Sequence, residues 1–355
     1  PEMIPQEEMI AILQKMVAEP ESGRFFQYRQ NTMEWHREAG VKLLTRVGCP
    51  ADTQQIFFAG GGQNSLAAIF AGFFRPGDKI GVDPLVYAGV KDAAKLFGIR
   101  LVPLKQENNE VMEESLRYAV KNDGIKGIYV MPDFHNPTTH TMTQRCRDMI
   151  GGVAREENLL VIEDGINSLL QEKPQKTIFA GAPEHTIFIL SLSKTISPAL
   201  RLACLAAAPK YRKTLGNALY SINLSQSALL IELASRLIVS GELEPLLARR
   251  REGLALRNRL TDEILGEYEV WGGAESLSRW LLLPRGITGM QFEELSLKQG
   301  VFVYGSERFA VGKDSPVAAA RLAICAPRTL AELERGLTIL RDLLKAMESL
   351  SKEAN

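Results

Sequence analysis

The chain has 355 residues, of which 45% are hydrophobic and 24% charged, so it can bury a large core without disulfide support. Lys plus Arg and Asp plus Glu both number 42; the formal charge is therefore zero, with no basic bias toward nucleic acid, and a small-molecule partner is favoured. The N-terminus has no basic start followed by an apolar run, and no apolar stretch is long enough to cross a bilayer, so we expect a soluble, cytoplasmic protein with reduced cysteines.

The first elements predicted along the chain are helices. Apolar residues recur at helical spacing over 5–18, and a second helix is predicted over roughly 33–46. From Gln55 onward, short strands rich in β-branched and aromatic residues alternate with helices, which predicts a mostly parallel sheet covered on both faces. The strands are expected within QQIFFA, DKIGVDP, IRLVPLK, IKGIYVMP, NLLVIEDG, HTIFILSLSK and LACLAAAP.

The C-terminal third changes character. The chain is predicted to be helical from about residue 213 to 268, and its charged run ARRREGLALRNRLTDEIL is interpreted as a solvated helix face. RWLLLP, GVFVYG and AARLAICAP, separated by helical segments, predict a smaller α/β domain that closes with a helix over 329–349. We therefore expect three parts, namely an N-terminal helical segment (1–45) that packs with the small domain, a large domain (46–245) and a small domain (246–355).

The most informative segment is SLSKTISPALRLA. Lys194 follows a strand, and a lysine used as a nucleophile needs a partly neutral amine, which desolvation and a neighbouring cation arrange. Ser191, Ser193 and Arg201 together suit a phosphate, because the guanidinium offers a planar fork and each hydroxyl one donor. A surface lysine in a strand-to-helix loop is the alternative.

This segment resembles the lysine motif of pyridoxal-phosphate (PLP) enzymes of fold type I, the class I/II aminotransferases, over about residues 20–346. The resemblance implies a large domain with a mostly parallel seven-stranded sheet flanked by helices, plus a smaller α/β C-terminal domain. It also implies that Lys194 holds PLP as a Schiff base and moves the substrate α-proton. Arg201, Ser191 and Ser193 would then hold the cofactor phosphate.

Asp164 ends a predicted strand in VIEDGINS. A carboxylate against the pyridine nitrogen of PLP keeps that nitrogen protonated, so the ring can accept electrons; a helix N-cap is the plainer interpretation. The resemblance implies that Asp164 is this carboxylate and is therefore a catalytic and cofactor-binding residue. The family usually has a tyrosine two or three residues later, where this sequence has Ile166 and Asn167.

Two loops carry further matches. YVMPDFHNPTTHTM resembles the P-x-x-x-N-P-T segment, which implies that Asn136 contacts the cofactor and the substrate, although Asn-Pro is also an ordinary turn. FAGGGQNSL places glycines before a helix, a site that favours phosphate, but no GK[ST] follows and it is not a P-loop. The resemblance assigns phosphate binding to Gly61, Gly62 and Gln63, with Ala59 where threonine is usual.

Three further residues match the family, namely Tyr87, Tyr28 and Arg321. The resemblance implies that Tyr87 stacks on the cofactor ring, that Tyr28 reaches the phosphate of the partner subunit, and that Arg321 binds the substrate α-carboxylate as a bidentate pair. Packing of Tyr87 and a surface salt bridge of Arg321 are the alternatives. His135 and His140 lack ligand spacing, so no metal is expected.

Together these matches predict a PLP-dependent aminotransferase that moves an amino group between an amino acid and a 2-oxo acid. We expect a homodimer with active sites at the interface, and no binding to membranes or nucleic acid. One alternative is the PLP-binding effector domain of a MocR/GntR-type transcription regulator without its DNA-binding part, because the sequence most resembles the aminotransferase-like domains of these regulators and their enzymatic relatives. Those regulators carry an N-terminal winged helix-turn-helix, and the segment before Tyr28 is short and not basic enough for one. A PLP lyase or decarboxylase is the third alternative.

Overall fold

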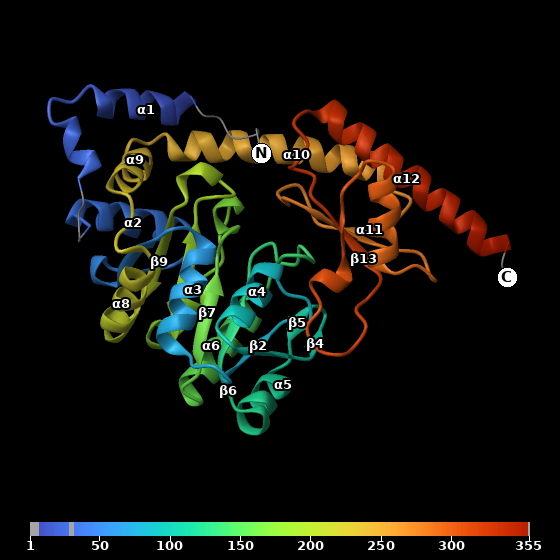
Figure 1. Ribbon diagram of the computed structural model, residues 1–355, viewed down its shortest axis with the longest axis horizontal. Helices are drawn as coiled ribbons and strands as arrows, with labels where there is room; N and C mark the ends of the chain where they lie inside the picture. Colours follow the sequence, from blue (N-terminus) through green and yellow to red (C-terminus); the bar gives the residue numbers. More distant parts are fainter. Residues whose placement is uncertain (1–6, 28–31, 354–355) are drawn as a thin grey trace.

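The computed structural model describes residues 7–27 and 32–353. A seven-stranded sheet in the order β1-β9-β8-β7-β6-β2-β3 forms its centre, as Figure 1 shows in part. The five strands β8, β7, β6, β2 and β3 run parallel, whereas β9 pairs antiparallel with both β8 and β1. The predicted fold class is confirmed. The strands are β1 Ile56–Ala59, β2 Lys79–Val82, β3 Arg100–Pro103, β6 Ile125–Val130, β7 Leu160–Asp164, β8 Thr186–Ser191 and β9 Ala203–Ala207.

Helices cover both faces of this sheet because successive strand residues point to opposite sides. In β8, Ile187 and Ile189 join the core under α3, α4 and α8, whereas Phe188 and Leu190 join the core on the opposite face. The helices of this layered part are α3 Gly62–Phe73, α4 Ala88–Leu96, α5 Glu113–Tyr118, α6 Gln144–Glu156, α7 Ile178–Gly181 and α8 Arg212–Asn223, and a short hairpin consists of β4 Gln106–Glu107 and β5 Glu110–Val111.

The N-terminal segment packs mainly on α9 (Ala228–Val239) and also meets the start of α10 (Leu243–Leu265), where Glu8 pairs with Arg249. Helices α1 (Glu7–Val17) and α2 (Glu34–Arg46) lie against α9, and Met16 and Leu43 share a core cluster with the apolar face of α9. Figure 1 shows α1 and α2 beside α9, at the opposite end of the molecule from β13. Burial of these apolar side chains explains the arrangement.

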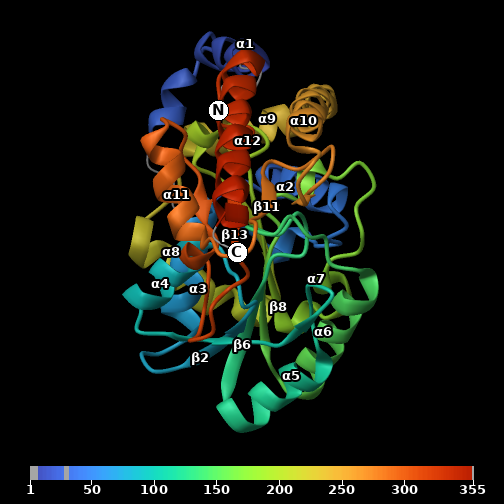
Figure 2. The ribbon, with the colours of Figure 1, turned by 90° about the vertical axis from the view of Figure 1, so that its right-hand side faces the viewer.

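The C-terminal part contains a four-stranded antiparallel sheet in the order β10-β11-β13-β12. Figure 2 shows the long helix α12 running along this part, with α11 beside it. The charged run on α10 is not wholly solvated, because Arg250 and Arg257 are only 1% and 4% exposed. The elements are α10 Leu243–Leu265, β10 Val270–Trp271, β11 Arg279–Leu282, α11 Gly289–Lys298, β12 Tyr304–Gly305, β13 Ala319–Leu322 and α12 Leu330–Glu353.

Two further expectations concern the whole chain. All four cysteines are free thiols. Among the helices of the described residues, none has the length and apolar character needed to cross a membrane.

Candidate functional site

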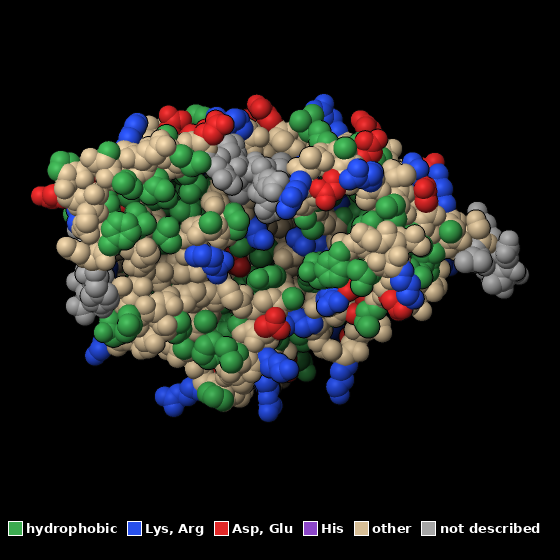
Figure 3. Space-filling view, turned by 45° about the horizontal axis from the view of Figure 1, so that its top comes forward, with side chains coloured by type: hydrophobic (Ala, Val, Ile, Leu, Met, Phe, Trp, Pro, Cys, Tyr) green, Lys and Arg blue, Asp and Glu red, His purple; other side chains and the backbone are tan. Residues whose placement is uncertain are grey.

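A cleft of about 610 Å³ lies where the carboxyl ends of the parallel strands meet the C-terminal sheet. Ligands of open α/β sheets bind at this edge. Figure 3 shows a hollow in the middle of the molecule, with Lys and Arg side chains around it. The cleft brings together five residues that the sequence singled out, namely Tyr87, Asn136, Asp164, Lys194 and Arg321.

Lys194 follows β8 and its side chain is accessible from the cleft. The surrounding protein lowers the pKa of its ε-amine by desolvation. Cys325 opposes this shift, and the positive charges of Arg321, Arg250 and Arg201 add to it. A larger fraction of the amine is therefore neutral at a given pH, as a nucleophilic lysine requires.

Asp164 ends β7 and is 3% exposed. Burial raises the pKa of its carboxyl to about 6, against the hydrogen bonds donated by Tyr129 Oη (2.7 Å) and the Ile166 backbone N–H (3.1 Å). Ionised Asp164 is thus held in a low-dielectric place where a cationic ring nitrogen would stabilise it strongly. Tyr129 is a functional candidate that the sequence does not single out, because a tyrosine inside an apolar strand is typical of core.

The glycine loop and Arg201 form one cradle. Gly61 has a φ of +94°, and a Cβ built there would lie 3.3 Å from Arg201 Nη2. Arg201 Nη2 also donates to the Gly60 carbonyl (3.3 Å). A Cβ at Gly62 would lie 3.7 Å from the Ser191 Cβ. The loop, Arg201 and the serine at the end of β8 therefore converge at the N-terminus of α3, a position suited to a phosphate.

Of the two other residues predicted to bind the phosphate, Ser193 lies in the cradle and the Gln63 side chain makes a different contact. The Ser193 backbone N–H and the Ser193 hydroxyl both lie within hydrogen-bonding distance of Ser191 Oγ (3.4 and 3.3 Å), so Ser193 belongs to the cradle. The Gln63 side-chain amide instead donates to the Gly89 carbonyl (2.8 Å) at the start of α4, and its Oε1 is buried without a partner. Tyr28 lies outside the described residues.

Asn136 and Arg321 carry buried polar atoms without partners. Asn136 precedes a cis peptide bond with Pro137, and its Oδ1 accepts no hydrogen bond. Arg321 stands on β13 opposite Trp280 and Tyr304, and its Nε is likewise unpartnered. Burial lowers the pKa of the Arg321 guanidinium. Native proteins satisfy nearly all such groups, so two of them beside one cleft fit a polar ligand.

Tyr87 is the N-terminal cap residue of α4, and burial, followed by the charge of Asp164, raises the pKa of its phenol. The loop before it is attached to the C-terminal part of the chain. The Val86 N–H donates to the Phe309 carbonyl (2.9 Å), and the Val311 N–H donates to the Pro84 carbonyl (2.9 Å).

The positions where a tyrosine is usual provide no phenol. Ile166 lines the cleft with an apolar side chain. Asn167 Nδ2 donates to the Phe134 carbonyl (2.9 Å), so that amide serves the local fold. The contact expected from the resemblance is therefore replaced by an apolar surface.

These walls fit PLP. An amine, an aromatic ring, a buried carboxylate and a phosphate cradle border one cleft, and unpartnered polar atoms remain for ligand groups. Within residues 7–27 and 32–353, no group of three His, Cys, Asp or Glu side chains could hold a metal ion. His135 instead lies 3.3 Å from Asp83, and His140 lies 3.5 Å from Glu110.

Comparison with known proteins agrees with this geometry. The family model described as aminotransferase class I and II matches residues 7–340. An HTH-type transcriptional regulator of Bacillus subtilis, YdeF, is 43% identical over 345 residues, which are 97% of this chain and 75% of YdeF. Aromatic-amino-acid aminotransferase 1 of Thermococcus litoralis is 26% identical, over 88% of this chain and 79% of that protein.

A solved structure shows the same fold. The kynurenine aminotransferase of Pyrococcus horikoshii superposes with a TM-score of 0.88 at 24% identity, covering 98% of this chain and 89% of that one. At this identity the likeness concerns the fold alone.

Proposed function

Because the chain belongs to the aminotransferase class I and II family, a PLP-dependent family, we propose that it is an aminotransferase that moves an amino group between an amino acid and a 2-oxo acid. One observation carries the proposal: a single cleft holds the accessible amine of Lys194, the buried carboxylate of Asp164 and the unpartnered guanidinium of Arg321. These three groups suit a cofactor aldehyde, a ring nitrogen and a substrate carboxylate respectively.

The proposed cofactor contacts follow from the walls of the cleft. Lys194 would hold PLP covalently and Asp164 would face its pyridine nitrogen. When bound, PLP supplies an electron sink for a carbanion at the substrate α-carbon. Tyr87 would lie against the ring and Asn136 Oδ1 or Nδ2 beside its polar edge. The phosphate would lie in the cradle of Gly61, Gly62, Ser191, Ser193 and Arg201, with Gln63 at its margin.

The chain's own chemistry is proton transfer and orientation. Arg321 would bind the α-carboxylate through two parallel hydrogen bonds, which fixes the α-carbon relative to Lys194. The Lys194 amine, whose pKa is lowered, would accept the substrate α-proton as a general base. The protonated amine would then donate a proton as a general acid. Ionised Asp164 would keep a proton on the ring nitrogen throughout.

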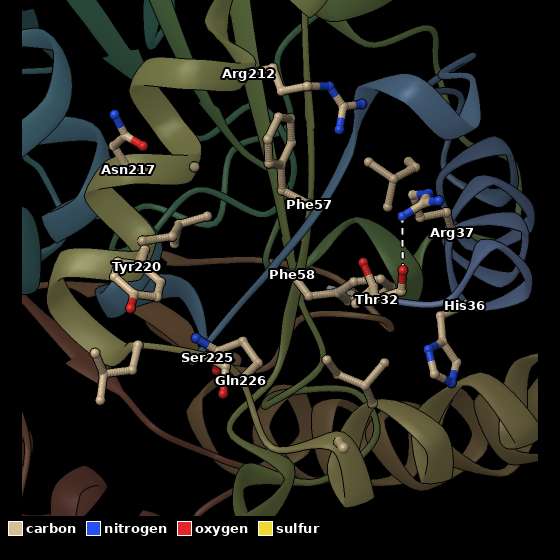
Figure 4. A pocket seen from close by; sticks show the side chains of 16 residues that line it. Thr32, His36, Arg37, Phe57, Phe58, Arg212, Asn217, Tyr220, Ser225 and Gln226 are labelled. Carbon is tan, nitrogen blue, oxygen red and sulfur yellow. Dashed lines mark hydrogen bonds between the residues drawn. The ribbon is translucent and has the colours of Figure 1, made fainter. Parts of the chain in front are cut away.

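We also propose a homodimer. A hollow of about 800 Å³ opens between α2, β1 and α8, where Phe57, Tyr220 and Gln226 surround it (Figure 4). Nearby, Tyr220 and Leu224 are 46% and 61% exposed. Gln226 also borders a smaller pocket that reaches Arg201, so a second copy on this face would close the phosphate cradle. Sedimentation analysis tests this: a monomer at micromolar concentration that retains PLP would contradict it.

A second function is favoured by one specific observation. YdeF, named a transcriptional regulator, is 43% identical over nearly this whole chain. The PLP site would then detect an amino compound rather than convert it. The apolar Ile166 in place of a phenol donor is consistent with chemistry that differs from that of the usual enzymes.

One experiment separates the two functions. The purified PLP form is incubated with a panel of amino acids, and conversion to the pyridoxamine form and release of a 2-oxo acid are followed, with Lys194→Ala as the matched control. Turnover by the wild type alone supports the aminotransferase. Spectral binding without a 2-oxo acid product supports the sensor, and failure to bind PLP refutes both.

A further inference from the structure

Arg250 on α10 is a buried cation that touches the chain at Lys194. Its side chain is 1% exposed, and its Nη2 donates to the Lys194 backbone carbonyl (3.2 Å). Its Nε and Nη1 are buried and donate to no partner, and no ion pair involves it within the described part of the chain. Burying a guanidinium in this way is costly, so a compensating role is expected.

Arg257 shows how this helix satisfies a buried arginine for structural purposes. It lies two turns further along α10, is 4% exposed, and donates to the carbonyls of Ile324 (2.9 Å) and Arg328 (3.2 Å). Arg257 therefore ties α10 to the segment after β13. Arg250 instead connects α10 to Lys194 in the large domain, and its Nε and Nη1 donate to no protein atom.

The charge of Arg250 also differs from that of the other cations near Lys194. In the proposed function Arg201 meets a phosphate and Arg321 meets a carboxylate, so ligands neutralise both. No anionic group of the cofactor or substrate is assigned to Arg250. The charged and titratable groups that act on the Lys194 amine are Arg250 from α10, Arg201 after β8, and Arg321 and Cys325 from the β13 region. The other titratable side chains that line the cleft are Tyr87, Lys91, Asp92, Asp164, Tyr304 and Arg308.

We propose that Arg250 is a positioning residue for Lys194: it fixes the Lys194 backbone carbonyl and places near this residue a positive charge that neither the cofactor phosphate nor the substrate carboxylate neutralises. The inference rests on the proposed PLP site. A nearby positive charge disfavours the protonated form of the lysine nitrogen, whether free or joined to PLP. Water in the cleft screens part of this effect, so we expect about half to one pH unit, a three- to tenfold change in the neutral fraction.

The first test titrates the PLP-bound protein. The pH midpoint of the cofactor absorbance change is measured for wild type, Arg250→Met, Arg250→Lys and the control Arg257→Met, with thermal unfolding of each. We expect Arg250→Met to raise the midpoint by about half to one unit, Arg250→Lys to stay closer to wild type because the charge remains, and Arg257→Met to leave the midpoint unchanged. An unchanged midpoint in Arg250→Met, or an equal shift in Arg257→Met, overturns the proposal.

A second test is independent of PLP. The apo protein is treated with trinitrobenzenesulfonate over a range of pH, and labelling of the Lys194 peptide is quantified by mass spectrometry. We expect labelling of Arg250→Met near pH 8 to be about three- to tenfold slower than that of wild type, while Arg250→Lys reacts at an intermediate rate. Equal rates in the three proteins refute the role of Arg250. If Arg250→Met fails to fold, the test relies on Arg250→Lys. A labelling rate and a pH midpoint of Arg250→Lys that both equal those of wild type would then refute the proposal. If wild type fails to link PLP to Lys194, the proposed function fails separately.

Discussion

Replacing Arg321 by Met tests the substrate end of the cleft. The Arg321 Nε is buried without a partner, and its guanidinium is the group placed to receive a carboxylate. Losing one partner of a buried, hydrogen-bonded charge pair costs about 2–5 kcal/mol. Since each 1.4 kcal/mol is tenfold, we expect kcat/KM for an amino acid to fall by about 30- to 3,000-fold.

The assay compares two ligands on the same variant. Pyridoxamine formation is followed by stopped-flow absorbance with the best amino acid of the panel and with the amine that lacks its carboxylate. Arg321→Met should lose its advantage for the amino acid and keep its rate with the amine, whereas Arg321→Lys should be intermediate because it keeps the charge and loses the fork. An equal loss with both ligands would show that Arg321 acts on folding or on PLP, and would refute the assignment.

The remaining predictions concern the cofactor side of the cleft. Ile166→Tyr should lower the pH midpoint of the cofactor absorbance change, because a phenol donor stabilises the phenolate form, and an unchanged midpoint in a spectral titration argues against this. Gly61→Ala forces a side chain into a φ of +94° and within 3.3 Å of Arg201, so PLP should be retained about tenfold less tightly in equilibrium dialysis; wild-type retention would be the contrary result. Tyr129→Phe removes the hydrogen bond that favours ionised Asp164, whose pKa is about 6, so that pKa rises and the acid limb of the pH profile of the half-reaction should move to higher pH. A limb that stays in place would show that Asp164 does not control it.

Much of the fold could be predicted because the strands are short, apolar and separated by amphipathic helices. This order permits few arrangements other than a parallel sheet covered on both faces. The partner of the N-terminal segment could not be predicted in detail, because an apolar helix face does not specify which other apolar face it meets. Met16 and Leu43 indicate burial, and only the structure shows that α9 covers them.

The candidate site could be predicted where a residue follows a strand, as Lys194 and Asp164 do, because strand ends meet at one edge of the sheet. Residues inside elements were missed. Tyr129 lies within β6 and Arg250 within the charged run of α10, where periodicity alone predicts core and solvent respectively. Their roles depend on contacts across 35 and 56 residues of sequence, to Asp164 and Lys194.

Two hydrogen bonds connect the loop before Tyr87 with the segment that precedes β13. The loop leads directly to the ring that is expected against the cofactor, and β13 carries Arg321. A ligand that contacts both Tyr87 and Arg321 would therefore touch both sides of this connection. The amide hydrogens of Val86 and Val311 form these bonds, so we expect their hydrogen-exchange rates to change when a ligand occupies the cleft, even where no product is formed.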